Sequence, residues 1–378
     1  MIPLTIIVVA YNRSECLCTL LTSLTHVKAS QTVDLVISID DYGTKEINSM
    51  ANSFEWHLGK KEVVLHKEHL GIIKHRLWVG DQTQRYEHIL YLEDDLYVSP
   101  EIVNYALQVI PFYEEDDRVA GCCLYNPHFT LSWMPFDKIE DGYDNFFFQH
   151  PYWGNIWYRR KWNFFKEYWT TYSVNHALLP LSVRTWNSES FNQIFIQYLI
   201  ETGRTMVYPR VSLLSNTGAA GLHMGEYSYV YSTLPVMATE KHYRFSTLDQ
   251  SLARYDAFEE LDVLVVKKQN PSLRDVDFEL DTKCNKDAYK AKYVLTPRRV
   301  TSVVQSFSTG FKPIETAVLM NISGSGLHLT LQKNVVFDKN DVRQLIINSW
   351  RTSLNMDSFM LQLTNIKTHF VKRWKPNK

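Results

Sequence analysis

The sequence predicts an α/β fold, with a mostly parallel sheet flanked by helices and a smaller α+β region at the C-terminal end. Three features of the 378 residues predict it. Apolar runs of strand length alternate with helical patterns over the first third, and strands that alternate with helices form parallel sheets covered on both faces. Two of these runs end in clusters of acidic residues, as expected where ligands bind beyond the carboxyl ends of strands. Beyond about residue 255 the apolar runs become shorter.

Each element of the N-terminal third follows from its local pattern. The run Leu4–Val9 is mostly β-branched, which is typical of a strand that is buried on both faces. Leucines at helical spacing then predict a helix with one apolar face, formed by Leu17, Leu20, Leu21 and Leu24. Further strands are predicted at Val33–Ile39, Glu62–Leu65 and His88–Leu92, and further helices at Lys45–Phe54 and Ile72–Thr83.

The middle of the chain is rich in aromatic residues. Residues 143–172 hold fourteen of them, and we expect most to lie in the core, with two or three free to stack on sugar faces. A helix is predicted over Pro180–Gly203 and a strand over Thr205–Leu214, followed by a glycine-containing loop that reaches His223.

A change of pattern near residue 255 predicts two domains, one over residues 1–250 and an accessory region over residues 255–378. In the accessory region, short β-type runs indicate strands at Val263–Val266, Val300–Val304, Ala317–Met320 and Leu327–Leu331. A final helix is predicted over Asn340–Trp374.

Composition excludes several classes of protein. Lys and Arg total 40 against 41 Asp and Glu, so the formal net charge is −1 and nothing in the overall balance favours nucleic acid as a partner. Hydrophobic residues make up 45% of the chain, which argues against disorder. The five cysteines lack the spacing of a disulfide framework, which predicts free thiols in a reducing cytoplasm. The apolar stretch Met1–Ala10 is too short for a signal peptide or a membrane span.

The most informative motif is the acidic triplet Glu93-Asp94-Asp95, which follows the predicted strand His88–Leu92. Three adjacent carboxylates repel one another unless a cation compensates them. Mg²⁺ and Mn²⁺ prefer oxygen ligands and keep open positions for substrate phosphates. One carboxylate on the cation and another on a ribose hydroxyl would suit a nucleoside diphosphate. A solvated acidic turn is the alternative, although the apolar residues Leu96 and Val98 that follow weigh against it.

With its flanks, the triplet resembles a known family. The stretch YLEDDLYVSPE (Tyr91–Glu101), with HLGIIKHRLWVGD (His69–Asp81) upstream and VVAYNR (Val8–Arg13) at the start, resembles the GT-A fold glycosyltransferases, whose sheet is Rossmann-like. Within them it is most similar to bacterial capsule and polysaccharide glycosyltransferases and to the N-acetylglucosaminyltransferase I type. The resemblance covers roughly residues 1–225, and it implies a nucleotide-binding half over about 1–100 and an acceptor-binding half over about 101–250.

The resemblance implies roles for several residues at the predicted sheet edge. Asp95 would be the direct ligand of Mn²⁺ or Mg²⁺. Asp41 would accept a hydrogen bond from the uracil N–H, with Asp40 as the alternative acid. For His75, a purely structural role stays open. Contacts to the nucleotide are implied for Ala10, Tyr11, Arg13, Asp41, His75, Glu93 and Asp94.

The same resemblance points to residues for the acceptor and the chemistry. Inverting transfer needs a carboxylate that takes the proton of the acceptor hydroxyl, and in the related enzymes it follows a Trp at the start of a helix. Here the matching residues are Trp186 and Glu189; the usual Asp is absent, and a favourable charge in a helix first turn is the alternative role of Glu189. Trp153 and Gly154 match a segment at the donor sugar. His223 would cover the diphosphate or serve as a second metal ligand.

These inferences predict a metal-dependent, inverting glycosyltransferase that moves a hexosyl or N-acetylhexosaminyl group from a UDP-sugar to a glycan acceptor in bacterial surface polysaccharide synthesis. A sugar-nucleotide nucleotidyltransferase stays open, although Tyr11–Cys18 lacks the glycine-rich loop of that class. A non-catalytic carbohydrate-binding module also stays open. The basic and aromatic end of the chain, Lys367–Lys378, would suit peripheral contact with the inner face of the plasma membrane and a lipid-linked acceptor. The residues themselves favour the alternative, a solvated basic helix end.

Overall fold

The structure is a computed structural model that describes residues 1–186, 190–219, 231–237, 240–338, 340, 343 and 345–347. The contacts divide the chain into two compact units. The first comprises residues 1–127 and 139–262, and the second comprises residues 128–138 and 263–378. Nothing in the sequence pattern indicates that residues 128–138 pack with the C-terminal unit. Within the described residues no helix has both the length and the apolar character needed to cross a bilayer.

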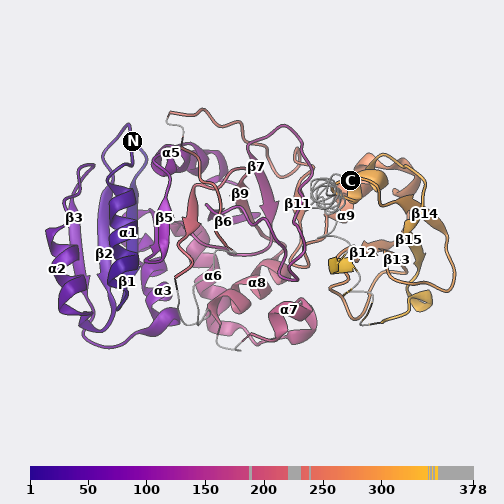
Figure 1. The fold of residues 1–378 in the computed structure, drawn as a ribbon, viewed down its shortest axis with the longest axis horizontal. Coiled ribbons are helices and arrows are strands. Elements are labelled where there is room, and N and C mark those ends of the chain that lie inside the picture. Colours follow the sequence, from indigo (N-terminus) through magenta and orange to yellow (C-terminus); the bar gives the residue numbers. More distant parts are fainter. Residues whose placement is uncertain are drawn as a thin grey trace, which may run out of the picture. The chain divides into compact units, whose positions relative to one another are not determined.

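The first unit is built on a sheet of nine strands in the described residues, in the order β11-β7-β9-β6-β8-β4-β1-β2-β3 (Figure 1). Five of its neighbouring pairs are parallel and three are antiparallel, which confirms the predicted α/β class. The strands are β1 (Leu4–Ala10), β2 (Asp34–Ile39), β3 (Lys61–Leu65), β4 (His88–Glu93), β6 (Val119–Cys123), β7 (Asn145–Phe148), β8 (Asn155–Tyr158), β9 (Thr205–Pro209) and β11 (Arg254–Tyr255).

Helices pack against this sheet and follow the predicted pattern over the first third. The leucines of the first helix are buried as its apolar face, and the second helix begins after Thr44, whose side chain accepts from the Ile47 N–H at 3.2 Å. The helices of the first unit are α1 (Ser14–Leu24), α2 (Lys45–Ser53), α3 (Gly71–Asp81), α4 (Thr83–Tyr86), α5 (Ile102–Tyr113), α6 (Arg159–Thr171), α7 (Leu181–Arg184) and α8 (Phe191–Thr202), with 3₁₀ turns η1 (Asp40–Tyr42) and η2 (His176–Leu178).

Half of the aromatic block lies in the core, fewer than predicted, and the other half is partly exposed. The fully or almost fully buried aromatic residues of residues 143–172 are Phe146, Phe147, Phe148, Trp157, Tyr158, Trp162 and Phe165. Trp162 packs so closely on α3 that a Cβ at Gly80 would lie 2.0 Å from its ring. The single helix predicted over Pro180–Gly203 is replaced by α7 and α8, and Gly203 ends α8 in the left-handed conformation.

A small second sheet brings a distant segment to the acidic triplet. The strand β5 (Leu96–Val98) follows the triplet directly and pairs antiparallel with β10 (Leu214–Asn216), so that Leu96 lies opposite Asn216. The strand predicted over Thr205–Leu214 is therefore two strands, β9 in the large sheet and β10 in the small one.

The second unit contains a four-stranded sheet within the described residues, in the order β12-β13-β15-β14. Its elements are α9 (Val263–Gln269), η3 (Pro271–Leu273), β12 (Phe278–Leu280), β13 (Tyr293–Thr296), β14 (Gln305–Ser308), α10 (Glu315–Leu319), β15 (Gly326–Leu331) and η4 (Gln332–Asn334).

Two predicted strands of this unit are wrong, and one is confirmed. Val263–Val266 opens helix α9, because a run of four apolar residues fits a helix face as well as a strand. Ala317–Met320 overlaps helix α10, in keeping with the helix-favouring residues Ala, Leu and Met in that run. Leu327–Leu331 lies in β15 as predicted. Val300–Val304 forms only a bridge, from Val300 to Val335.

The five cysteines all fall within the described residues and are free thiols, as predicted, with no disulfide between them. Most of the helix predicted over Asn340–Trp374 lies outside the described residues.

Candidate functional site

The strand register brings the predicted nucleotide residues to one edge of the sheet. In the parallel ladders Ala10 lies opposite Ile39, and Val9 lies opposite Glu93. The residues that follow β1, β2 and β4 therefore leave the sheet at the same edge, beyond the carboxyl ends of the strands. Ala10 is the buried last residue of β1, and Tyr11 after it is exposed.

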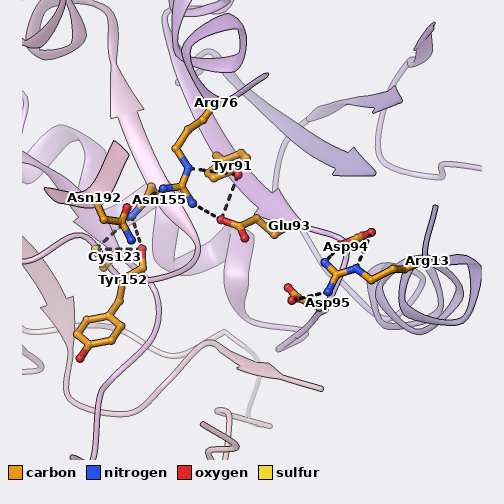
Figure 2. Close-up of polar contacts among 10 residues, drawn as sticks. All are labelled: Arg13, Arg76, Tyr91, Glu93, Asp94, Asp95, Cys123, Tyr152, Asn155 and Asn192. Carbon is orange, nitrogen blue, oxygen red and sulfur yellow. Dashed lines mark hydrogen bonds and ion pairs between the residues drawn. The ribbon is translucent and has the colours of Figure 1, made fainter. Parts of the chain in front are cut away.

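Arg13 compensates two carboxylates of the triplet (Figure 2). It lies at the start of α1, and its guanidinium donates from Nη1 to Asp95 Oδ2 at 3.0 Å. The same guanidinium forms an ion pair with Asp94 through Nη2 and a longer contact from Nε to Oδ2 at 3.4 Å. The structure thus places Arg13, predicted to contact the nucleotide, on the two acids predicted to hold ribose and metal.

The triplet is costly to keep ionised in this position. Burial raises the pKa of Asp94 from 3.8 to about 6, and the Arg13 guanidinium offsets only part of that rise. Burial and the neighbouring Glu93 carboxylate also raise the pKa of Asp95. The Asn216 side chain, near the same carboxylate, offsets part of this rise. Among the described residues the buried Oδ1 atom of Asp95 has no hydrogen-bond partner, which makes it the candidate ligand atom.

Glu93 has a different partner, the buried Arg76 of helix α3. Arg76 forms an ion pair with Glu93 Oε1, and Tyr91 donates its hydroxyl to the same oxygen at 3.1 Å. The guanidinium also donates from Nη1 to Asn192 Oδ1 at 2.6 Å and lies over the Phe191 ring at 4.9 Å. Figure 2 shows how this network joins the triplet to the first turn of α8. No pattern in the sequence indicates this connection.

The two acids after β2 have different surroundings. Asp40 is buried and accepts from the N–H groups of Leu70 and Gly71 at 2.7 and 3.0 Å, and it pairs with His69. Its carboxylate therefore fixes the segment that leads into α3. Asp41 is exposed and has a left-handed backbone, with φ at 47°. Asp41 is thus the acid whose carboxylate faces solvent at the edge, and its contact with uracil stays a prediction.

His75 has the contacts of a structural histidine. Its Nε2 lies 2.7 Å from Ser38 Oγ, and the Ser38 hydroxyl lies 2.9 Å from His66 Nε2. Burial lowers the pKa of His75 to about 4, so the ring is neutral. Its polar contact is thus with the hydroxyl of Ser38 in β2, and the predicted nucleotide contact stays a prediction.

The loop after β10 adds residues that the sequence analysis missed. Thr217 donates its N–H to the carbonyl of Asp95 at 2.8 Å, and its side-chain hydroxyl is buried. Asn216 accepts from the Gly218 N–H at 2.7 Å. The sequence showed only a flexible loop here; the pairing of β5 with β10, a long-range contact, brings it to the triplet.

Trp153 and Gly154 immediately precede β8. Gly154 has a φ of +66°, and a Cβ there would lie 2.0 Å from Leu214 Cδ2, so packing against β10 requires the glycine. Asn155 donates to the carbonyl of Tyr152 at 2.9 Å and to Cys123 Sγ at 3.2 Å, which fixes this turn (Figure 2). Trp153 is half-buried. A contact of either residue with the sugar stays a prediction.

Trp186 lies next to an unusual histidine. The Trp186 and His150 rings meet edge to face at 5.9 Å. His150 is buried, and burial lowers its pKa to about 3. In the part of the chain that the structure describes, neither of its ring nitrogens has a hydrogen-bond partner. No sequence signal marks this residue. The predicted base Glu189 and the predicted second metal ligand His223 lie outside the described residues.

The described residues contain no group of three or more His, Cys, Asp or Glu side chains arranged to hold a metal ion. Whether a divalent cation fits this site is judged on the Oδ1 atom of Asp95, which has no hydrogen-bond partner among these residues. This buried, unpartnered Oδ1 is a suitable ligand atom for a hard divalent cation, which takes the remainder of its ligands from water and phosphate.

The comparisons with known proteins concern the fold and the class of the chain. Residues 5–179 match the model of glycosyl transferase family 2. This match and the mostly parallel sheet support a GT-A fold glycosyltransferase domain in the first unit. No curated protein sequence matches the chain.

Among solved structures, the chain is similar to TarS 1-349 of S. aureus, with 12% identity over 56% of this chain and 59% of that one, at a TM-score of 0.38. The structure of TarS 1-349 in complex with UDP-GlcNAc shows 14% identity over 58% of this chain and 60% of that one, at a TM-score of 0.40. The chain thus spans about three fifths of the length of these structures.

Proposed function

We propose that the chain is a metal-dependent, inverting glycosyltransferase that moves a sugar from a UDP-sugar to a glycan acceptor in bacterial surface polysaccharide synthesis. The observation that carries this proposal is the acidic triplet at the carboxyl end of β4, in a mostly parallel sheet. Within the described residues one oxygen of its Asp95 has no hydrogen-bond partner. The match of residues 5–179 to a glycosyltransferase family supports the same reaction class.

The donor nucleotide would bind across the edge formed by β1, β2 and β4. Asp41 and Tyr11 are exposed there, and a carboxylate that accepts from a ring N–H distinguishes uracil from cytosine. Asp95 would hold the divalent cation. When bound, the cation would supply positive charge against the leaving diphosphate.

In the proposed reaction, the acceptor hydroxyl oxygen forms a bond with the anomeric carbon while the bond from that carbon to the diphosphate oxygen breaks. The proton of the hydroxyl passes to a carboxylate base, and the electron pair of the broken bond leaves on the diphosphate. Glu189 is our candidate base, and Trp153 and Trp186 are candidate contacts for the sugars.

We also infer a cytoplasmic location at the inner face of the plasma membrane, with a lipid-linked acceptor. The support is sequence alone, namely the basic and aromatic segment Lys367–Lys378. Co-sedimentation with vesicles that contain anionic lipid tests it, and equal recovery of the full chain with neutral and anionic vesicles would contradict it.

The proposal is tested first with a panel of UDP-sugars and Mn²⁺, scored by donor hydrolysis and by thermal shift. We expect one UDP-sugar to be hydrolysed, and we expect Asp95→Ala to reduce this activity by at least about a hundredfold, because the cation loses its protein ligand. Asp249→Ala is the matched control, since it removes an exposed carboxylate that pairs with Arg118. Full activity of a folded Asp95→Ala protein would sink the metal assignment.

A further inference from the structure

Arg13 occupies the position of a counter-cation within the acidic triplet. Its guanidinium contacts one oxygen of Asp95 and both oxygens of Asp94, while Arg76 compensates Glu93 separately. Arginine remains protonated in proteins, so this charge cannot be removed by titration. Arg13 and a divalent cation would therefore share the same carboxylates.

Charge balance favours an exchange of these two cations. In the structure three carboxylates face two guanidinium groups, which leaves one negative charge uncompensated. If a divalent cation took the place of Arg13 between Asp94 and Asp95, the cluster would be neutral. The two positive groups would repel each other if both stayed on Asp95. The released guanidinium would then need another anion.

Arg13 is placed so that it can turn away from the triplet. Its side chain is 29% exposed, and it follows two exposed residues, Tyr11 and Asn12, in the loop after β1. By contrast, the Arg76 side chain is 9% exposed and is held by Glu93, Tyr91 and Asn192. Within the described residues Asp95 Oδ1 is buried without a hydrogen-bond partner, while Oδ2 is bonded to Arg13. The two oxygens of Asp95 thus differ, and only Oδ2 is engaged by the guanidinium.

We propose that Arg13 competes with the divalent cation for Asp94 and Asp95, and that the diphosphate of the donor relieves this competition by binding the guanidinium. Arg–phosphate pairs are strong and often bidentate, so the diphosphate is a suitable second partner. Cation and nucleotide then bind cooperatively, and the cation alone binds weakly. This inference rests on the proposed function, because it takes Asp95 as the cation ligand and a nucleoside diphosphate as the donor group.

The test is to measure the binding of Mn²⁺ to the full chain by electron paramagnetic resonance, with and without UDP. Without UDP, we expect Arg13→Gln to bind Mn²⁺ about tenfold more tightly than the wild type, within the usual range of coupling between ligands. With saturating UDP, we expect the two affinities to agree within about twofold, because the diphosphate has removed the competitor. An Arg13→Gln protein that binds Mn²⁺ no more tightly than the wild type without UDP would overturn the proposal.

Two further variants separate competition from simple charge. Arg13→Lys keeps the positive charge but cannot bridge both carboxylates with a planar fork, so competition predicts an intermediate affinity. Arg85→Gln removes a guanidinium that pairs with Glu62, far from the triplet in the fold, and should leave Mn²⁺ binding unchanged. If the tenfold gain of Arg13→Gln persists in full with UDP, the arginine acts through its charge alone and competition is refuted.

The same data distinguish this inference from the proposed function. Asp95→Ala should abolish Mn²⁺ binding with and without UDP. If the wild type binds Mn²⁺ through Asp95 but Arg13 substitutions change nothing, the competition fails and the proposed function stands. If UDP binds and Mn²⁺ does not bind to any variant, the metal-dependent function fails and the competition fails with it. Circular dichroism on each variant confirms that the comparison is between folded proteins.

Discussion

At the scale of single residues, the edge of the sheet separates side chains that hold the structure from side chains that face solvent. Asp40 and His75 are buried and bonded to backbone or to Ser38. Asp41 is exposed. Asp40 and Asp41 are neighbours in the sequence, yet one is buried and the other faces solvent. The reason is that a strand end and a tight turn direct successive side chains to opposite sides.

The neutral, buried state of His75 leads to a prediction about pH. The native pKa is about 4 and the unfolded value is 6.5, so between these values the unfolded chain binds more protons. Stability from this group is therefore full above pH 6.5 and is lost as the pH falls toward 4, by about 3 kcal/mol at most. We expect His75→Gln, which can still bond to Ser38, to reduce the loss of unfolding free energy between pH 7 and pH 5 in urea titrations.

The matched control is His57→Gln, since His57 is an exposed histidine whose Nε2 lies 3.1 Å from the Val27 carbonyl oxygen. It should leave the pH dependence near that of the wild type. An identical dependence in the wild type and in His75→Gln would show that His75 does not contribute.

The same residues show how far the sequence could predict the site. The triplet and Asp41 could be found because they follow apolar strands, and parallel strands align their carboxyl ends. The partners could not be found, because Arg13–Asp94, Arg76–Asn192 and Thr217–Asp95 join residues far apart in the chain. No local pattern encodes such pairs. Local spacing also could not reveal His150. Its distinguishing property is that, among the described residues, its two ring nitrogens have no hydrogen-bond partner.

At the scale of elements, β10 couples the turn before β8 to the triplet. Leu214 pairs with Val98, the last residue of β5. The side chain of Leu214 also occupies the space that a Cβ on Gly154 would need. A change at Gly154 would therefore displace the strand that lies beside the metal-site candidate. Strand prediction succeeded where β-branched runs were long, as in β1, and failed at Val263–Val266, where a short apolar run has no unique period.

We predict that Gly154→Ala is more destabilising than Gly203→Ala. Both glycines have a φ of +66°, so both alanines carry the backbone cost of about 1 kcal/mol. Only at Gly154 would the new Cβ also meet Leu214, at 2.0 Å, whereas no atom lies within 4 Å of a Cβ at Gly203. We expect a total loss of about 2 to 4 kcal/mol in the free energy of unfolding for Gly154→Ala.

Urea unfolding of the two variants measures this difference, and Leu214→Ala in the Gly154→Ala background should recover part of the loss. Equal destabilisation at the two glycines would mean that β10 adjusts without cost. If Gly154 instead matters only to the sugar, Gly154→Ala would lower donor hydrolysis while the unfolding free energy stayed near that of Gly203→Ala.

At the scale of the whole molecule, the first unit is discontinuous in the sequence. The first unit resumes at residue 139 after residues 128–138 have packed with the second unit. The change of sequence pattern near residue 255 lies close to the end of the first unit at residue 262. Nothing in the sequence indicates that residues 128–138 belong to the second unit. Their assignment depends on contacts with residues more than a hundred positions away, which composition and periodicity do not record.

This arrangement predicts how a shortened chain should behave. A protein that ends at residue 262 would keep the whole nucleotide edge but would leave residues 128–138 without their unit. Met134 and Phe136 in this segment are 2% and 3% exposed in the full chain, and each would cost about 1.5 to 3 kcal/mol if it lost its apolar surroundings. We therefore expect the shortened chain to self-associate in gel filtration and to unfold at a lower temperature.

Replacing residues 128–138 in it by a glycine–serine linker of the same length should restore a monomer that still binds UDP. A shortened chain that is equally monomeric and stable with or without its own segment would show that residues 128–138 do not depend on the second unit.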